Sequence, residues 1–155
     1  AAYLPTTEHN AMLAEGAKGF TMLGNAGADV SVIFGGLAAS TVAIRDQKDV
    51  LQRAIRANVK AQRFIMDPSK RDKVIAHGVE WTGVTKEVAT AVYNIAVKEQ
   101  TWYKDTIPPD QVMKDTINFN RELMKMTAEF QPSQLFDLSF AQAAVKELDA
   151  KGWKP

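Results

Sequence analysis

Apolar side chains recur at helical spacing through most of the chain after residue 44. Within residues 46–66 they step by four, three, four and three positions, which places them on one face of a helix. These residues are Val50, Ala54, Ala57, Ala61 and Phe64. We therefore expect this face to be buried, and residues 46–66 to form the most regular helix of the chain.

Four further helices are expected, over residues 69–77, 85–98, 108–127 and 140–151. Each range begins at or directly after a residue suited to a helix N-terminus, and these residues are Ser69, Thr85, Pro108 and Ser139. Ser139 and Gln142 together have the pattern of a capping box. Gly78 and Gly152 stand where the first and last of these helices should end.

The first 36 residues have a different pattern, in which short β-favouring runs are bounded by glycine. Residues 19–24 and 30–35 are interpreted as strands, and the apolar run at 1–4, which ends at Pro5, as the remnant of another. Thr6 or Thr7 can cap a short helix that ends at Gly16. These few strands form too small a sheet for the helices to cover. We therefore expect a helix-rich α/β fold whose remaining strands lie upstream.

Composition and charge narrow the possible functions. Nineteen Lys and Arg stand against eighteen Asp and Glu, which gives a net charge of +1 and no bulk attraction to nucleic acid. The chain has no cysteine, which excludes disulfides and thiolate metal sites. His9 and His77 lack a second ligand at metal-binding spacing and a neighbouring nucleophile. We therefore expect no catalytic residue, no metal and no cofactor.

Several short motifs occur in a characteristic order along the chain. They are Ala-Ala-Tyr-Leu-Pro at 1–5, Gly-Phe-Thr-Met-Leu at 19–23, Gly-Gly at 35–36, Asp-Pro at 67–68, Thr-Gly-Val at 82–84, Phe-Asp-Leu-Ser-Phe at 136–140 and Gly-Trp at 152–153. In this order they resemble the C-terminal half of ABC-importer solute-binding proteins of the nitrate, sulfonate and taurine type, which are related to thiamine-precursor-binding proteins.

That resemblance implies a type 2 periplasmic-binding fold, in which two lobes close on a solute by a hinge motion. Residues 1–36 would be a remnant of the second, inserted α/β lobe with its crossover strand, and residues 37–155 the helical C-terminal part of the first lobe. Gly35 and Gly36 would then form the hinge. The resemblance also implies a periplasmic or other extracytoplasmic location, a membrane permease as partner, and no nucleic acid.

The candidate ligand-binding residues gather where a strand end meets a helix N-terminus, the place where open α/β sheets present binding groups. They are Tyr3, Thr6, Thr7 and Glu8. The same residues also suit plain capping, because the threonines can cap the helix and Glu8 complements its dipole. Glu8 would repel an anion unless its side chain points away, so a small oxyanion and an amine-bearing or neutral organic solute both stay open.

Two other functions compete with solute binding. Thiamine-pyrimidine-synthase-like enzymes resemble the same fold, but they use iron and carry a cysteine-rich segment that this chain lacks. A helical interaction module could instead use a basic stripe at helical spacing, Arg53, Arg56, Lys60 and Arg63. Such a stripe is more often a solvated outer face, which is the interpretation we prefer.

Two further expectations concern packing. Unpaired strands near residues 1 and 30 would favour a homodimer through strand pairing. The aromatic residues near helix ends should pack against the core, and they are Trp81, Trp102, Tyr103 and Trp153.

Overall fold

The computed structural model describes residues 32–33, 35–98, 103 and 105–155. The regular elements of this part are helices: α3 (Thr41–Asp46), α4 (Lys48–Met66), the 3-10 helix η1 (Pro68–Lys70), α5 (Arg71–Thr82), α6 (Lys86–Lys98), α7 (Asp110–Met124), α8 (Pro132–Leu135) and α9 (Ser139–Ala150). The helix-rich character expected from the sequence is confirmed for these residues, which contain no strand.

The expected β elements lie largely elsewhere in the chain. The strand over 19–24, the strand remnant at 1–4, the helix after Thr6 and the strand-paired dimer all involve residues outside the described ranges. Residues 32, 33 and 35 of the second expected strand are described, and they have no strand structure.

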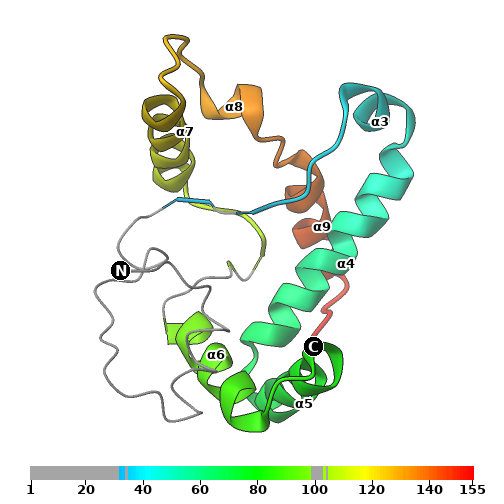
Figure 1. Cartoon of the computed structure of the whole chain (residues 1–155). Helices are drawn as coiled ribbons and strands as arrows, with labels where there is room; N and C mark the ends of the chain where they lie inside the picture. The colour runs from blue at the N-terminus through cyan, green and yellow to red at the C-terminus, as the bar shows by residue number, and fades with distance from the viewer. Residues whose placement is uncertain (1–31, 34, 99–102, 104) are drawn as a thin grey trace, which may run out of the picture.

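A long central helix, α4, packs against the last helix, α9 (Figure 1). Val59 of α4 and Ala144 of α9 are fully buried at their contact, and Leu148 is 2% exposed. Ile55, Val145 and Trp153 pack around these three residues. Burying an aliphatic side chain of this size contributes about 1.5–3 kcal/mol relative to leaving it exposed. The contact therefore joins two helices that lie far apart in the sequence.

Helices α5 and α6 pack on each other near the C-terminal end of α4 (Figure 1). The buried residues of this pair are Ile75, Val88, Tyr93 and Ala96. The Tyr93 hydroxyl donates a hydrogen bond to the Ile65 carbonyl of α4 at 3.2 Å. The pair is thus attached to the central helix by a polar contact as well as by packing.

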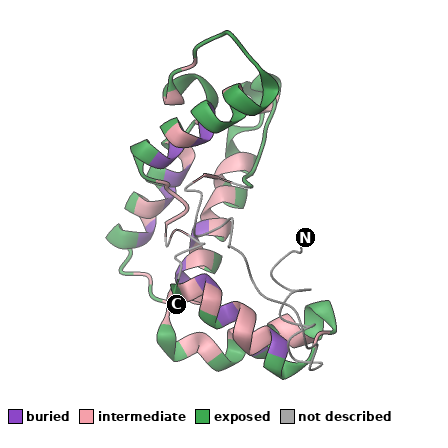
Figure 2. Cartoon of the chain, turned by 60° about the vertical axis from the view of Figure 1, so that its left-hand side comes forward, coloured by how far each residue is buried: buried purple, intermediate pink, exposed green. Residues whose placement is uncertain are grey.

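Helices α7 and α8 form a separate small unit opposite α3 (Figure 1). The buried residues of α7 are Val112, Met113, Thr116 and Ile117. The end of α7 is set by Lys125, whose φ of 53° places it in the left-handed region. Among the described residues, buried positions form small patches on the helices, next to intermediate positions and opposite exposed ones (Figure 2).

The predicted buried face of α4 is wrong. Val50 is 49% exposed, and Ala54, Ala57 and Ala61 are exposed too. The buried side chains of α4 are instead Val59 and Arg63. Larger aliphatic side chains remove more apolar area from water than alanines do, so α9 packs on the side that carries Ile55 and Val59.

Two predicted helix boundaries are also corrected. The helix predicted to stop before Gly78 continues to Thr82, and Gly83 ends it with a φ of 73°. Glycine in a helix interior costs only about 1 kcal/mol relative to alanine, which tertiary packing can offset. Ser69 does not cap this helix but lies within η1. Asp67 caps η1, because its carboxylate accepts the Ser69 backbone N–H at 2.8 Å.

The N-terminus of α9 is arranged differently from the expected capping box. The Ser139 backbone N–H and hydroxyl donate to the Asp137 carboxylate at 3.0 Å and 2.6 Å. These hydrogen bonds lower the pKa of Asp137, because they stabilise its charged form. The expected cap at Thr85 is confirmed, since its hydroxyl accepts the Val88 N–H at 3.4 Å.

Replacing the central leucine tests the importance of the α4–α9 contact. We expect Leu148→Ala to lower the free energy of unfolding by about 2–5 kcal/mol, because it leaves a cavity between the two helices. The matched control is Leu123→Ala on α7, where the leucine is 69% exposed. Urea denaturation should show an effect below about 0.5 kcal/mol for the control, and equal losses for both variants would contradict the assigned core.

Candidate functional site

The predicted ligand-binding residues Tyr3, Thr6, Thr7 and Glu8 lie outside the described residues. Their role stays a prediction. The predicted hinge, Gly35 and Gly36, is described.

Both glycines lie in an exposed stretch of chain that runs from α7 across to α3 (Figure 1). A Cβ atom added to Gly35 or Gly36 would meet no heavy atom within 4 Å. Neither glycine has a positive φ, a property that Gly83 and Gly152 do have. The observed conformation therefore requires glycine at neither position. Glycine would matter here if the backbone also adopts other conformations, which larger residues avoid.

Each end of this stretch is fixed by a hydroxyl group. The Ile33 backbone N–H donates to the Thr116 hydroxyl of α7 at 2.8 Å, and that hydroxyl donates to the Val112 carbonyl at 2.7 Å. Thr116 is only 8% exposed. At the other end, the Ala43 N–H donates to the Ser40 hydroxyl, which caps α3. Residues 35–39 thus connect two anchored points and are exposed along their whole length.

The basic stripe on α4 is not the solvated outer face that the sequence predicted. Arg63 is 9% exposed and lies between two carboxylates. Its Nε donates to Asp105 at 2.6 Å and its terminal nitrogen donates to Asp149 of α9 at 2.7 Å. The hydrogen bond to Asp105 raises the pKa of Arg63, and Asp149 acts in the same direction. Arg63 therefore joins α4, α9 and the segment before α7.

Two more cations of the stripe, Arg56 and Lys60, contact α9 or the residues that follow it. Arg56 donates to both oxygens of Glu147 at 3.0 Å and 2.9 Å, and Lys151 donates to that carboxylate at 2.7 Å. These contacts lower the pKa of Glu147, with Lys151 the larger influence and Arg56 the next. The Lys60 ammonium lies 5.3 Å from the centre of the Trp153 ring. Long basic side chains can cover the edge of an apolar contact in this way.

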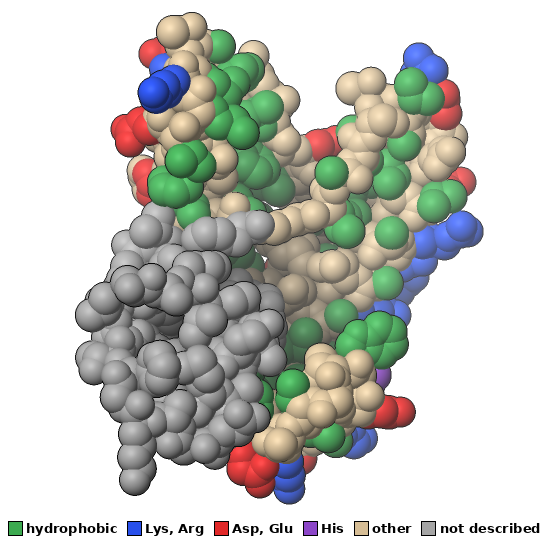
Figure 3. Space-filling view, in the orientation of Figure 1, with side chains coloured by type: hydrophobic (Ala, Val, Ile, Leu, Met, Phe, Trp, Pro, Cys, Tyr) green, Lys and Arg blue, Asp and Glu red, His purple; other side chains and the backbone are tan. Residues whose placement is uncertain are grey.

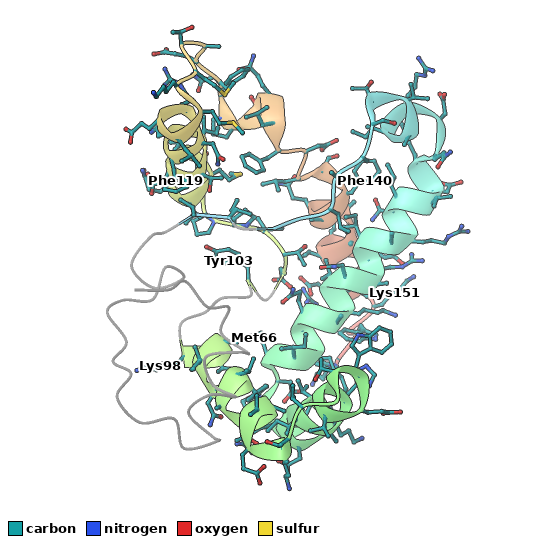
Figure 4. The ribbon with its side chains drawn as sticks, viewed as in Figure 1. Met66, Lys98, Tyr103, Phe119, Phe140 and Lys151 are labelled. Carbon is teal, nitrogen blue, oxygen red and sulfur yellow. The ribbon has the colours of Figure 1, made fainter. Side chains whose placement is uncertain are left out.

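Of the four stripe residues, Arg53 is left exposed and without a partner among the described residues. The stripe is therefore chiefly a structural seam between α4 and α9. Lys151, at the end of α9, lies beside α4 in Figure 4.

A groove between α7 and α8 is a feature that sequence reasoning missed. It has a volume of about 270 Å³, and a hollow of about 470 Å³ beside it shares Arg121 and Met126 with it. Residues of α7, of α8 and of the loop between them line the groove. Apolar side chains gather over both helices on the molecular surface (Figure 3). A signal was present in the sequence, since Phe130, Leu135 and Phe136 follow α7 closely and have no helical period of their own.

The groove contains one unusual polar group. The Nε of Arg121 is buried and has no hydrogen-bond partner among the described residues. The Arg121 side chain lies 3.9 Å from Glu129, whose side chain is 83% exposed. A guanidinium in this position can hold an acceptor that the protein itself does not supply.

The described part of the chain holds no group of three or more side chains arranged to bind a metal ion. His77 is 73% exposed and lies 6.2 Å from the Trp81 ring. Trp81 itself is 82% exposed, so the expectation that it packs against the core is wrong. Trp153 does pack against the α4–α9 core as expected. None of the helices in the described ranges is both long enough and apolar enough to cross a membrane.

No protein-family model, curated protein or solved structure matches the chain.

Removing the Arg63 guanidinium tests the charged seam. We expect Arg63→Met to lower the free energy of unfolding by about 2 kcal/mol, because two carboxylates lose their shared donor while water still reaches them. Arg63→Lys should recover only part of this loss, since lysine lacks the planar fork that serves both partners. Arg53→Met is the control, and a loss as large as that of Arg63→Met would contradict the assignment.

Acid titration tests the Glu147 contacts. A lowered pKa in the folded state stabilises the fold above the unfolded pKa, about 4.3, and this stabilisation is lost as the pH falls through the folded value. The stability difference between wild type and Glu147→Gln should therefore be largest near neutral pH and shrink below about pH 4. It should also shrink in 1 M NaCl. A difference that is independent of pH and salt would show that these ion pairs contribute nothing.

Proposed function

We propose that this chain is part of the extracytoplasmic solute-binding protein of an ABC importer. In this proposal, the complete protein has the two-lobed, type 2 α/β fold. Residues 1–36 belong to the second lobe and its crossover, and residues 37–155 form the helical C-terminal part of the first lobe. The resemblance of the motif order described above supports this choice of family.

The observation that carries the proposal is the crossover segment. Residues 35–39 are exposed and include two adjacent glycines, and they run between the Thr116 anchor on α7 and the Ser40 cap of α3. A connection between lobes needs fixed ends and a middle whose backbone can rotate. Both anchors lie in residues 37–155, which the proposal assigns to the first lobe, so they hold the crossover against that lobe while the glycines leave its backbone free to rotate.

The exposed face of α4 is a second support. Val50, Ala54, Ala57 and Ala61 follow the helical period yet have no covering element in the described part of the chain. Helices in two-lobed α/β proteins cover the faces of mostly parallel sheets, and small side chains permit a close approach. The proposal places a sheet of the first lobe against this face.

The mechanism requires binding and closure but no bond chemistry. A solute enters between open lobes, contacts groups from both, and stabilises the closed arrangement by its differential affinity. Tyr3, Thr6, Thr7 and Glu8 would line one wall, where hydroxyl and backbone N–H groups can bind an oxyanion and Glu8 can bind an amine. A membrane permease would then recognise the closed form.

The two competing functions gain no support. The iron-dependent enzyme needs a cysteine-rich segment, and the chain has no cysteine. The basic interaction module needs free cations, but Arg56 and Arg63 are engaged by carboxylates and Lys60 lies over an aromatic ring.

Solute screening tests the proposal directly. The complete protein that carries this chain is heated with nitrate, alkanesulfonates including taurine, aromatic acids and pyrimidines in turn. One class should raise the melting temperature by several degrees, because a ligand at 100 times its Kd stabilises by about 2.7 kcal/mol. The variant Tyr3→Ala with Thr7→Ala should lose this shift. If no class raises the melting temperature, the binding assignment fails.

Restricting the glycines tests the hinge. We expect Gly35→Val and Gly36→Val to leave the melting temperature of the solute-free protein nearly unchanged, because the positions are open. Both should weaken solute binding by about tenfold, since a β-branched residue excludes backbone conformations that closure requires. Gly78→Ala, within α5, is the matched control. Unchanged affinity in both valine variants would rule out the hinge role.

A further inference from the structure

The groove between α7 and α8 has an apolar wall and a single polar group that lacks an acceptor. The wall consists of Ile117, Met126, Phe130, Leu135 and Phe136. Thr116 and Asn120 also border the groove. Their polar atoms are already engaged, because the Thr116 hydroxyl bonds to Val112 and Ile33 and the Asn120 amide donates to the Thr116 carbonyl at 2.8 Å.

Arg121 is therefore the group that can bind a ligand in this groove. Its Nε is buried without a hydrogen-bond partner among the described residues, and its contact to Glu129 is long at 3.9 Å. A buried donor of a charged group is costly when it is left unpaired. The Arg121 side chain as a whole is 27% exposed, so an anion in the groove could form two parallel hydrogen bonds with the terminal nitrogens of the guanidinium, although not with the buried Nε.

The surroundings restrict the kind of anion. The volume of about 270 Å³ is near the lower limit for small-molecule pockets. Phe130 and Phe136 favour a flat aromatic body. Glu122 and Lys125 both border the adjoining hollow, and Arg121 is the one charged residue that lines the groove itself, so the groove offers a ligand a single positive charge. A small, singly charged ligand fits best.

We propose that the α7–α8 groove is a binding site for a small aromatic monocarboxylate, with the carboxylate on Arg121 and the ring against Phe130 and Phe136. The proposal does not rest on the solute-binding function, because none of these residues belongs to the predicted ligand cleft or hinge. It assigns to this unit a binding role separate from transport.

Benzoate is the probe, and the methyl group of Met126 is the local reporter. The complete protein is labelled with ¹³C at its methionine methyl groups, and the Met126 signal is assigned from the variant Met126→Leu. Benzoate should shift this signal saturably, with a Kd on the order of 1 mM for so small a ligand. Benzamide, which is neutral, and acetate, which lacks the ring, should bind at least tenfold more weakly. The variant Tyr3→Ala with Thr7→Ala should leave the benzoate shift of Met126 unchanged, so the two proposals fail independently.

Variants separate the roles of charge and wall. Arg121→Gln should weaken benzoate binding at least tenfold and keep the wild-type melting temperature, because Arg121 makes no close hydrogen bond within the described residues. Arg53→Gln, an exposed arginine on α4, should keep wild-type affinity. Leu135→Ser, at a wall position that is 55% exposed, should weaken binding without unfolding the protein. The site is excluded if Met126 does not respond to 10 mM benzoate, if benzamide binds equally well, or if Arg53→Gln weakens binding as much as Arg121→Gln.

Discussion

The packing of α4 against α9 is the interaction on which the rest of the described structure depends. Its centre is apolar, with Val59 facing Ala144 and Leu148, and its flank is charged, with Arg63 held by Asp105 and Asp149. The contact joins residues nearly ninety positions apart, so α5 to α8 all lie within one closed loop of chain. Closing so long a loop has an entropic cost that only a substantial interface can offset. The charged flank adds orientation, because one guanidinium fixes three segments together.

The positions of the helices could be predicted from the sequence, but the face that each helix buries could not always be. Period and capping residues placed α4, α6 and α9 within a few residues of their observed ends. On α4, however, two apolar stripes share one helix. The alanine-rich stripe is longer, whereas the stripe with Ile55 and Val59 has more apolar area per residue. The choice between them depends on a partner helix, which periodicity does not reveal.

The candidate sites differ in the same way. The double glycine at 35–36 could be recognised in the sequence, because glycine adopts backbone conformations that other residues avoid. Its anchor on Thr116 was not visible, because that hydrogen bond spans 83 positions in the chain. The buried position of Arg63 was equally hidden, since its carboxylate partners come from two distant segments. The unpaired Nε of Arg121 could be recognised only after α8 and the preceding loop were placed beside α7. Local chemistry can be read from a sequence, whereas the pairing of distant groups depends on tertiary structure.

Together these features describe a helical frame with an attached, exposed segment at residues 35–39. The α4–α9 pair forms the most extensive contact between described helices, while the 35–39 segment and the α7–α8 unit are attached to it by fewer contacts. This difference in attachment suits a protein whose parts move relative to one another on binding, as the proposed solute-binding function requires. The proposed function also gives the exposed apolar face of α4 a partner, because it places a sheet of the first lobe against that face.

Native-state hydrogen exchange tests this central claim most directly. Backbone amides in residues 55–63 of α4 and 144–148 of α9 should share the highest protection and open together as denaturant is added, because neither helix is buried without the other. Amides of α7 should open separately, at a lower free energy. If α9 exchanged freely while α4 kept its full protection, the α4–α9 contact would not be the interaction that holds this structure together.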